Sequence, residues 1–237
     1  MDQESLREIS QGNATAADRQ RTFFNRVFGW MFAGLGISAL LAYHTAKSGV
    51  LLKNPNLPVL LLIATFALVF VLTLAINKMS ATAATLCFIG YAALNGVMLS
   101  SLLYVYTLSS VMQAFCATAL MFGATGLYGY VTRRDLTSAG SFFFMALIGI
   151  IIASLLNMFF RSGALDFAIS ILGVIIFVGL TAYDVQKIKQ LALAHGDGAF
   201  DGETAEKASI LGALTLYLDF INLFLYVLRF LGNRNDR

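Results

Sequence analysis

The sequence predicts an all-α integral membrane protein, and two observations carry that prediction. Hydrophobic residues occupy 58% of the 237 positions and charged residues only 12%, whereas soluble domains average about 45–50% and about 25%. The charged residues also stand at the edges of long apolar runs, and each run can supply the roughly 20-residue helix that crosses a bilayer. We therefore expect membrane spans joined by short loops.

The apolar runs divide into seven expected transmembrane helices. Trp30 and Tyr43 suit the two interfaces of the first helix, and Lys78 follows the second. No charged residue occurs from Met79 to Thr132, a stretch long enough for two crossings with a turn in the polar segment 104–110. The expected spans are 27–46, 59–76, two within 79–132, 136–160, a sixth that begins at Phe167, and a seventh over 208–231.

Residues 1–25 are polar and mixed in charge, and they lack the basic start and apolar stretch of a signal peptide. We expect them to form an uncleaved, mobile cytoplasmic tail. Residues 26–237 are expected to form a single membrane domain.

Lysine and arginine counts in the loops predict a cytoplasmic N-terminus. This orientation places ten basic residues on the cytoplasmic side and three, Lys47, Lys53 and Arg161, in the outer loops. Seven full crossings would place the three C-terminal arginines outside as well, whereas a re-entrant last segment would place them inside. The re-entrant alternative therefore stays open.

Composition argues against several classes of protein. The net charge is only +3 and the basic residues lie in loops and termini, which does not fit a nucleic-acid partner. Cys87 and Cys116 fall inside expected spans, so they predict neither a disulfide nor a redox motif. The two histidines stand apart from other candidate ligands. We expect no cofactor and no bound transition metal.

Glycines recur at helical spacing in two spans. Gly123, Gly126 and Gly129 lie in the fourth, and Gly173 and Gly179 lie in the sixth. Small residues at such spacing let helix backbones approach closely in lipid, so we favour a packing role over a hinge or pore role.

Two aspartates are the candidate site residues. Asp219 lies near the middle of the apolar seventh span, where a carboxylate costs at least about 2.5 kcal/mol unless it has a partner, a proton or water. Asp184 lies near the cytoplasmic end of the sixth span. The midpoint between the two positions falls in the glycine-rich loop HGDGAFDGET, so in a helical hairpin both would sit at the same height. If they face each other, the two carboxyl groups would share one proton and could act as a pH sensor.

Four stretches then identify a family resemblance. They are GVIIFVGLTAYDVQKIK, YAALNGVMLSSL, LYGYVTRRDL and ILGALTLYLDFINLFLYVLRFLGNR. With them the chain closely resembles the Bax inhibitor-1 family, and within it the bacterial inner-membrane branch. The resemblance implies seven helices with the last one central, and a pH-sensitive calcium leak in which Asp184 and Asp219 sense protons. Calcium would be the transported ion, with the lipid bilayer as the other partner.

The resemblance also implies a latch. A basic residue that ends the second helix pairs with the sixth-helix aspartate in a bacterial relative, and Lys78 occupies the matching place here. Lysine cannot form the two-pronged contact that arginine makes with a carboxylate. The tendency of basic residues to lie on the cytoplasmic side explains Lys78 about equally well.

Two other functions remain alternatives. The runner-up is a non-conducting membrane regulator that binds a membrane protease or a cell-death or stress factor. The more remote one is an intramembrane aspartyl protease, which would need glycines before its second aspartate, where this chain has Leu216, Tyr217 and Leu218. We therefore expect no enzymatic activity and no catalytic residue.

Overall fold

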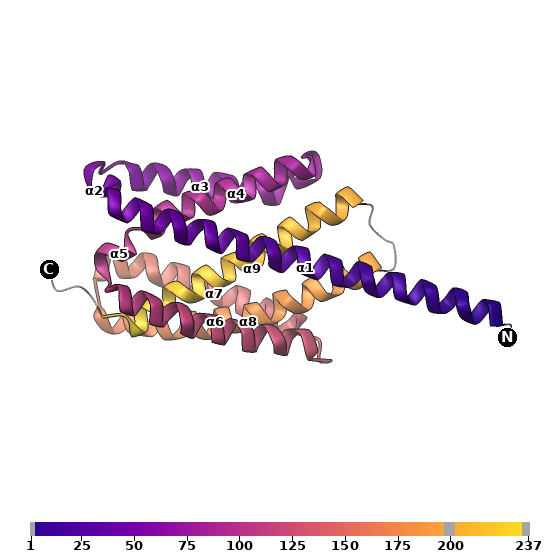
Figure 1. Ribbon diagram of the computed structural model, residues 1–237. Helices are drawn as coiled ribbons and strands as arrows, with labels where there is room; N and C mark the ends of the chain where they lie inside the picture. The colour runs from indigo at the N-terminus through magenta and orange to yellow at the C-terminus, as the bar shows by residue number, and fades with distance from the viewer. Residues whose placement is uncertain (1–2, 197–201, 234–237) are drawn as a thin grey trace. The chain divides into compact units, whose positions relative to one another are not determined.

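Helices make up nearly all of the chain that the computed structural model describes, residues 3–196 and 202–233 (Figure 1). Pro58 lies in the first turn of α3, where its missing N–H leaves no bond unmade. Arg161 ends α7 in the left-handed conformation, with φ at 49°. The elements are α1 (Gln3–Ser48), α2 (Val50–Lys53), α3 (Leu57–Ala75), η1 (Ile76–Lys78), α4 (Ala81–Leu99), α5 (Leu102–Val105), α6 (Leu108–Val131), α7 (Thr137–Phe160), α8 (Gly163–Gly196) and α9 (Gly202–Leu231).

Seven stretches of the described chain are long and apolar enough to cross a membrane, which confirms the predicted fold class. The last of them, α9, is the most buried, since 67% of its most apolar window is inside the protein, against 33% or less for the others. This agrees with a central last helix. α9 is also an unbroken helix of 30 residues, about 45 Å long, which favours a full crossing over a re-entrant segment.

Three helices begin earlier than the hydropathy pattern predicts. α8 begins at Gly163 and not at Phe167, and α9 begins at Gly202 and not near Ala208. α1 begins at Gln3, so the segment expected to be a mobile tail is helical and continuous with the first span. Backbone hydrogen bonding does not require apolar side chains, and this polar segment contains no proline to stop the helix.

The described helices group into two compact units. The first unit comprises residues 1–41, 51–98 and 187–214, and the second comprises 42–50, 99–186 and 215–237. α1, α8 and α9 each contribute to both, so the division does not follow chain order.

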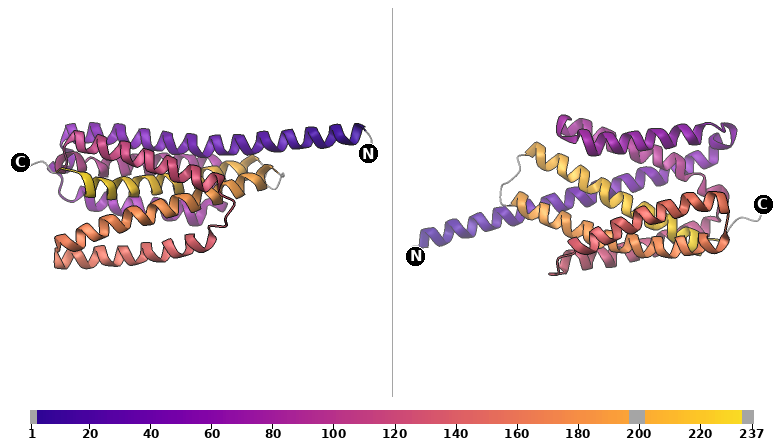
Figure 2. Two further views of the ribbon diagram at one scale, coloured as in Figure 1. Left: turned by 90° about the horizontal axis from the view of Figure 1, so that it is seen from below. Right: turned by 180° about the vertical axis from the view of Figure 1, so that it is seen from behind.

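In the first unit α1 packs closely against α4. The Ser38 hydroxyl donates a hydrogen bond to the Ala92 carbonyl at 2.7 Å. A methyl group at Gly96 would lie 2.6 Å from the Ser38 carbonyl oxygen, so this contact requires glycine. The right view of Figure 2 shows α3 and α4 running side by side, and the Thr65 hydroxyl of α3 lies 3.6 Å from the Met98 sulfur.

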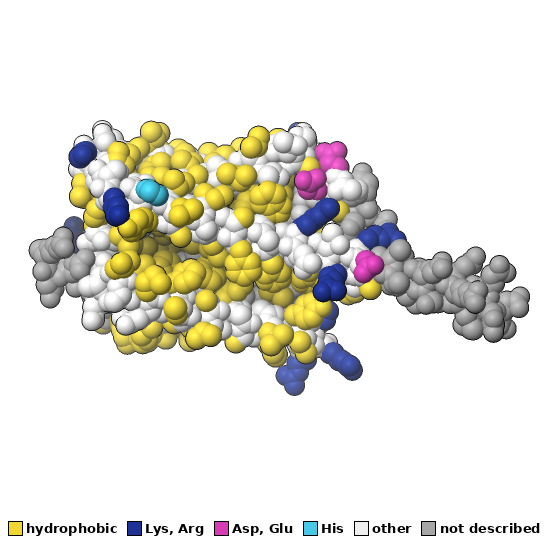
Figure 3. Space-filling model, in the orientation of Figure 1, with side chains coloured by type: hydrophobic (Ala, Val, Ile, Leu, Met, Phe, Trp, Pro, Cys, Tyr) yellow, Lys and Arg dark blue, Asp and Glu magenta, His cyan; other side chains and the backbone are white. Residues whose placement is uncertain are grey.

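In the second unit α7 packs against α8. Gly140 faces the ring of Tyr183, and Gly179 faces the ring of Phe143, each so closely that an added methyl group would overlap the ring. Outward-facing aromatic side chains such as Phe144 and Phe159 are 58% and 84% exposed. Figure 3 shows hydrophobic side chains over much of the visible surface, as lipid contact requires.

Candidate functional site

Asp219 is the most deeply buried acid of the described chain, at 5% exposure in the middle of α9. Its immediate neighbours in the sequence, Leu218 and Phe220, are apolar, while Thr215 and Asn222 lie one turn away on the same helix. The ring of Phe220 makes edge-to-face contacts with Phe115 and Phe122 of α6, with ring centroids 5.5 Å apart in each case. These contacts hold α9 against α6 at the height of the carboxyl group.

Asp184 of α8 lies beside Asp219, and both belong to the second unit. The two carboxyl groups are within electrostatic and hydrogen-bonding reach of each other. The sequence predicted that the two positions lie at the same height and left open whether they face each other, and the contact agrees with equal height. Residues 197–201 of the loop that supplied the symmetry argument lie outside the described residues.

The contact between the two groups has a chemical requirement. An ionised carboxylate can only accept hydrogen bonds, so two carboxyl groups bond to each other only when one of them carries a proton. Within the described residues, Oδ2 of Asp219 has no hydrogen-bond partner. Burying a carboxyl oxygen without a hydrogen bond costs less free energy when the carboxyl group is neutral than when it is ionised. The geometry therefore suits one proton held by the pair.

Helix α6 is fixed on α8 on both sides of Asp184. A methyl group at Gly129 would overlap the carbonyl oxygen of Ala182, and one at Gly126 would lie 3.6 Å from a methyl of Val185. These two glycines therefore bring the backbone of α6 directly onto the turn of α8 that carries the aspartate. The packing role predicted for this glycine series is confirmed at Gly129, while Gly123 faces open space.

Gln186 fastens the loop between α6 and α7 to α8. It is 7% exposed. Its Oε1 accepts a hydrogen bond from the Leu136 amide at 2.9 Å, and its Nε2 donates one to the Arg134 carbonyl at 2.8 Å. Sequence reasoning missed this residue, because nothing in the DVQKIK stretch distinguishes a buried glutamine from a solvated one.

Asp135 of the same loop binds the first residue of α7, Thr137. It accepts hydrogen bonds from the hydroxyl of Thr137 at 2.6 Å and from its amide at 2.9 Å. The side-chain bond and then the backbone bond lower the pKa of this exposed carboxyl below its usual value. Asp135 therefore stays ionised and takes no part in a proton switch near neutral pH.

Lys78, the third predicted site residue, is the last residue of η1 and is exposed. It belongs to the first unit, whereas Asp184 belongs to the second, so the latch between them stays a prediction. The turn after Lys78 is bound by another lysine. The Nζ atom of Lys207 donates to the Met79 carbonyl at 3.1 Å and pairs with Glu203 at 3.3 Å.

A second polar cluster lies at the other end of α9. The Arg229 guanidinium binds both carboxylate oxygens of Asp166, and its Nε lies 3.0 Å from Oδ2. The Asn157 amide donates to the same carboxylate at 3.5 Å. The cluster borders a cavity of about 370 Å³. Sequence reasoning treated Asp166 only as a loop residue.

Among the described residues, no group of three His, Cys, Asp or Glu side chains could hold a metal ion.

Comparison with known proteins decides the family. Residues 20–236 match the family described as inhibitor of apoptosis-promoting Bax1. This chain belongs to the Bax inhibitor-1 family. Among its Bax inhibitor-1 relatives, the inner membrane protein YbhL of Escherichia coli is 49% identical over 218 residues, which cover 90% of this chain and 92% of YbhL.

Two further relatives extend the match. A protein of Deinococcus radiodurans is 43% identical over 233 residues, which cover 98% of this chain and 99% of the relative. A protein of Borreliella burgdorferi is 47% identical over 218 residues, which cover 90% and 93%. The Bax inhibitor-1 resemblance seen in the sequence is thereby confirmed across nearly the whole chain.

Proposed function

We propose that this protein is a pH-sensitive calcium leak channel in which Asp184 and Asp219 form the proton sensor. The observation that carries the proposal is the pairing of these two carboxyl groups inside membrane-spanning helices. Like charges about 4 Å apart repel by roughly 4 kcal/mol at an effective dielectric of 20. Removal of the shared proton would therefore destabilise the packing of α8 against α9.

A few kcal/mol is the size of the energy gap between two states of a bistable helix bundle. The gain or loss of one proton would then change the populations of a closed and a leaking arrangement. α8 and α9 are suited to transmit the change, because α6 is packed directly on α8 beside Asp184. Calcium is the transported ion in this proposal and not a resident cofactor.

We place the protein in the bacterial inner membrane with its N-terminus in the cytoplasm. The name of the relative YbhL as an inner membrane protein supports the membrane, and ten cytoplasmic basic residues against three in the outer loops support the orientation. Reporter fusions at Gly198, which lies outside the described residues, would be expected to report the cytoplasm.

The alternative is a non-conducting regulator of a membrane protease or a cell-death or stress factor. The family description, which names an inhibitor of a protein partner, favours this alternative. The protease hypothesis has less support. Leu216 and Tyr217 are fully buried beside Asp219, where a protease would need glycines to let the backbone of a substrate approach closely.

Calcium flux into liposomes separates these functions. We expect purified protein to admit calcium faster than protein-free liposomes and to do so with a rate that changes between about pH 5 and 8. A regulator would give the rate of protein-free liposomes at every pH. Peptide-bond cleavage without calcium flux would instead support the protease.

A further inference from the structure

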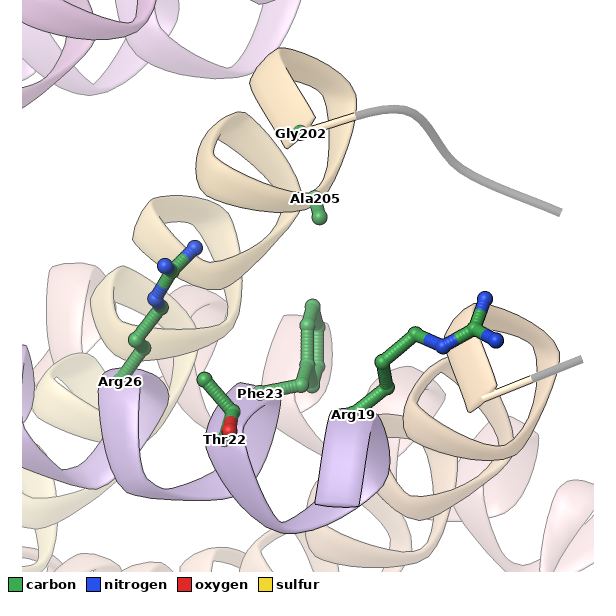
Figure 4. Close-up of a pocket in the computed structure, with 6 residues that line it drawn as sticks. All are labelled: Arg19, Thr22, Phe23, Arg26, Gly202 and Ala205. Atoms are coloured by element: carbon green, nitrogen blue, oxygen red, sulfur yellow. The ribbon is translucent and has the colours of Figure 1, made fainter. Parts of the chain in front are cut away.

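A positively charged pocket lies in the first unit, where α1 meets the start of α9 (Figure 4). Its volume is about 240 Å³. Four lining residues come from α1 and two come from the first turn of α9, and none of them is acidic. They are Arg19, Thr22, Phe23, Arg26, Gly202 and Ala205.

On the α1 side of the pocket, the lining side chains lie on one face of the helix. Arg19, Phe23 and Arg26 are spaced by four and then three residues, so they project from the same side of α1. Phe23 is 1% exposed, and Figure 4 shows its ring between the two arginine side chains, directed toward Ala205. The pocket thus has an apolar floor with a guanidinium on each side.

The α9 side supplies small residues at a helix N-terminus. Gly202 and Ala205 bring little bulk, and a methyl group added to Gly202 would meet nothing within 4 Å. The first amide groups of a helix have no intrahelical partner and carry partial positive charge. Glu203 also belongs to this turn, but it pairs with Lys207 and does not line the pocket.

The pocket also lies next to the start of the apolar run of α1, where the sequence places the membrane surface. Val27, the first residue of the apolar run, is completely buried and packs near Gly212 of α9. Arg26 directly precedes this run, and Arg19 lies about 10 Å further from it along the helix. Guanidinium groups at that depth face the phosphates of a bilayer and not its acyl chains.

We propose that this pocket binds the phosphate headgroup of an anionic phospholipid. Arg19 and Arg26 would bind phosphate oxygens, the Thr22 hydroxyl would donate a further hydrogen bond, and the first turn of α9 would add its amide groups. The acyl chains would continue along the apolar part of α1. A lipid held in this place would join α1 to the helix that carries Asp219.

Trp30 gives a direct test, because it is the only tryptophan of the chain and follows Arg26 by one helical turn. Purified protein would be placed in phosphatidylcholine vesicles that contain either brominated anionic phospholipid or brominated phosphatidylcholine at equal mole fraction. Bromine quenches tryptophan fluorescence at short range. We expect stronger quenching by the anionic lipid in the parent protein.

Arg26→Gln and Arg19→Gln should each lower the preference for anionic lipid by more than about fivefold, which is the loss expected from a basic residue that is only near an anionic surface. Thr22→Glu should lower it without removing either arginine. Arg21→Gln is the matched control, since Arg21 is exposed on α1 but does not line the pocket. Equal losses in Arg21→Gln and Arg26→Gln would mean diffuse attraction to the surface and would overturn the proposal, as would a parent without preference.

A second arm distinguishes the lipid from a soluble anion. Inorganic phosphate would be titrated into the same vesicles at constant ionic strength. The lipid assignment predicts that millimolar phosphate leaves the quenching unchanged. If phosphate abolishes the preference for anionic lipid, the site belongs to a soluble phosphate and the lipid assignment is wrong.

Discussion

Arg229 of α9 holds Asp166 of α8 through both carboxylate oxygens, at the end of these helices remote from the loop between them. The two side chains are 36% and 27% exposed. A planar guanidinium matches a carboxylate in this two-pronged geometry, so the pair fixes both the distance and the rotation of the two helices.

The first prediction concerns this ion pair. Arg229→Gln and Asp166→Asn should each lower the stability of the protein in detergent, and a double-mutant cycle should give a coupling of about 1 kcal/mol, because partial burial limits screening by solvent. Thermal unfolding of the parent, the single variants and the double variant measures the coupling. Strictly additive losses would show that the pair contributes nothing as a pair.

The second prediction concerns the contact of α6 with α8. Gly129→Ala should destabilise the protein by about 1–3 kcal/mol, because the new methyl group overlaps the Ala182 carbonyl and the helices must separate. Gly123→Ala is the control on the same helix. It faces open space, so the better helix propensity of alanine should leave stability unchanged or raise it slightly.

The same two variants also test how the proton sensor is supported. Separation of α6 from α8 beside Asp184 should change the pH profile of calcium flux in Gly129→Ala and leave it unchanged in Gly123→Ala. A Gly129→Ala protein with the parent's stability and the parent's profile would contradict the proposed support.

These contacts also define how far the sequence alone could predict the structure. Glycine spacing predicted close packing, yet it did not indicate that Gly129 meets Ala182 while Gly123 meets nothing. Equal distance from one loop placed Asp184 and Asp219 together, because hairpin geometry depends only on position along two helices. Gln186 and Asp166 bind partners 50 and 63 residues away, respectively, and no local pattern indicates such pairs.

Helix ends show the same limit. Hydropathy located the apolar core of each span, but the helices continue into polar sequence at Gly163, Gly202 and Gln3. The pocket beside Phe23 depends on two of these extensions, since Gly202 and Ala205 precede the expected start of the seventh span and its four α1 residues precede that of the first.

The third prediction tests the latch between Lys78 and Asp184. Lys78→Met should change the calcium leak and shift its pH midpoint, because the positive charge that would pair with Asp184 is gone. Lys78→Arg should preserve or strengthen closure, since arginine can contact both carboxylate oxygens. Lys53→Met, which removes another exposed lysine of the first unit, is the control. If Lys78→Met conducts calcium like the parent at every pH, Lys78 contributes only to the orientation of the protein in the membrane.

The fourth prediction is that Asp184 and Asp219 titrate as one unit. Asp184→Asn or Asp219→Asn should each flatten the pH dependence of calcium flux between about pH 5 and 8, because a single carboxyl group has no second charge with which to share a proton. The double variant should add little to either single one, since residues that act together are not additive.

Asp135→Asn is the control. An asparagine oxygen can still accept the hydrogen bonds from Thr137, and the lowered pKa of Asp135 places its titration below this range. Retention of the parent's pH profile by both single variants would exclude the pair as the sensor, and Asp219 would then act as a buried structural acid.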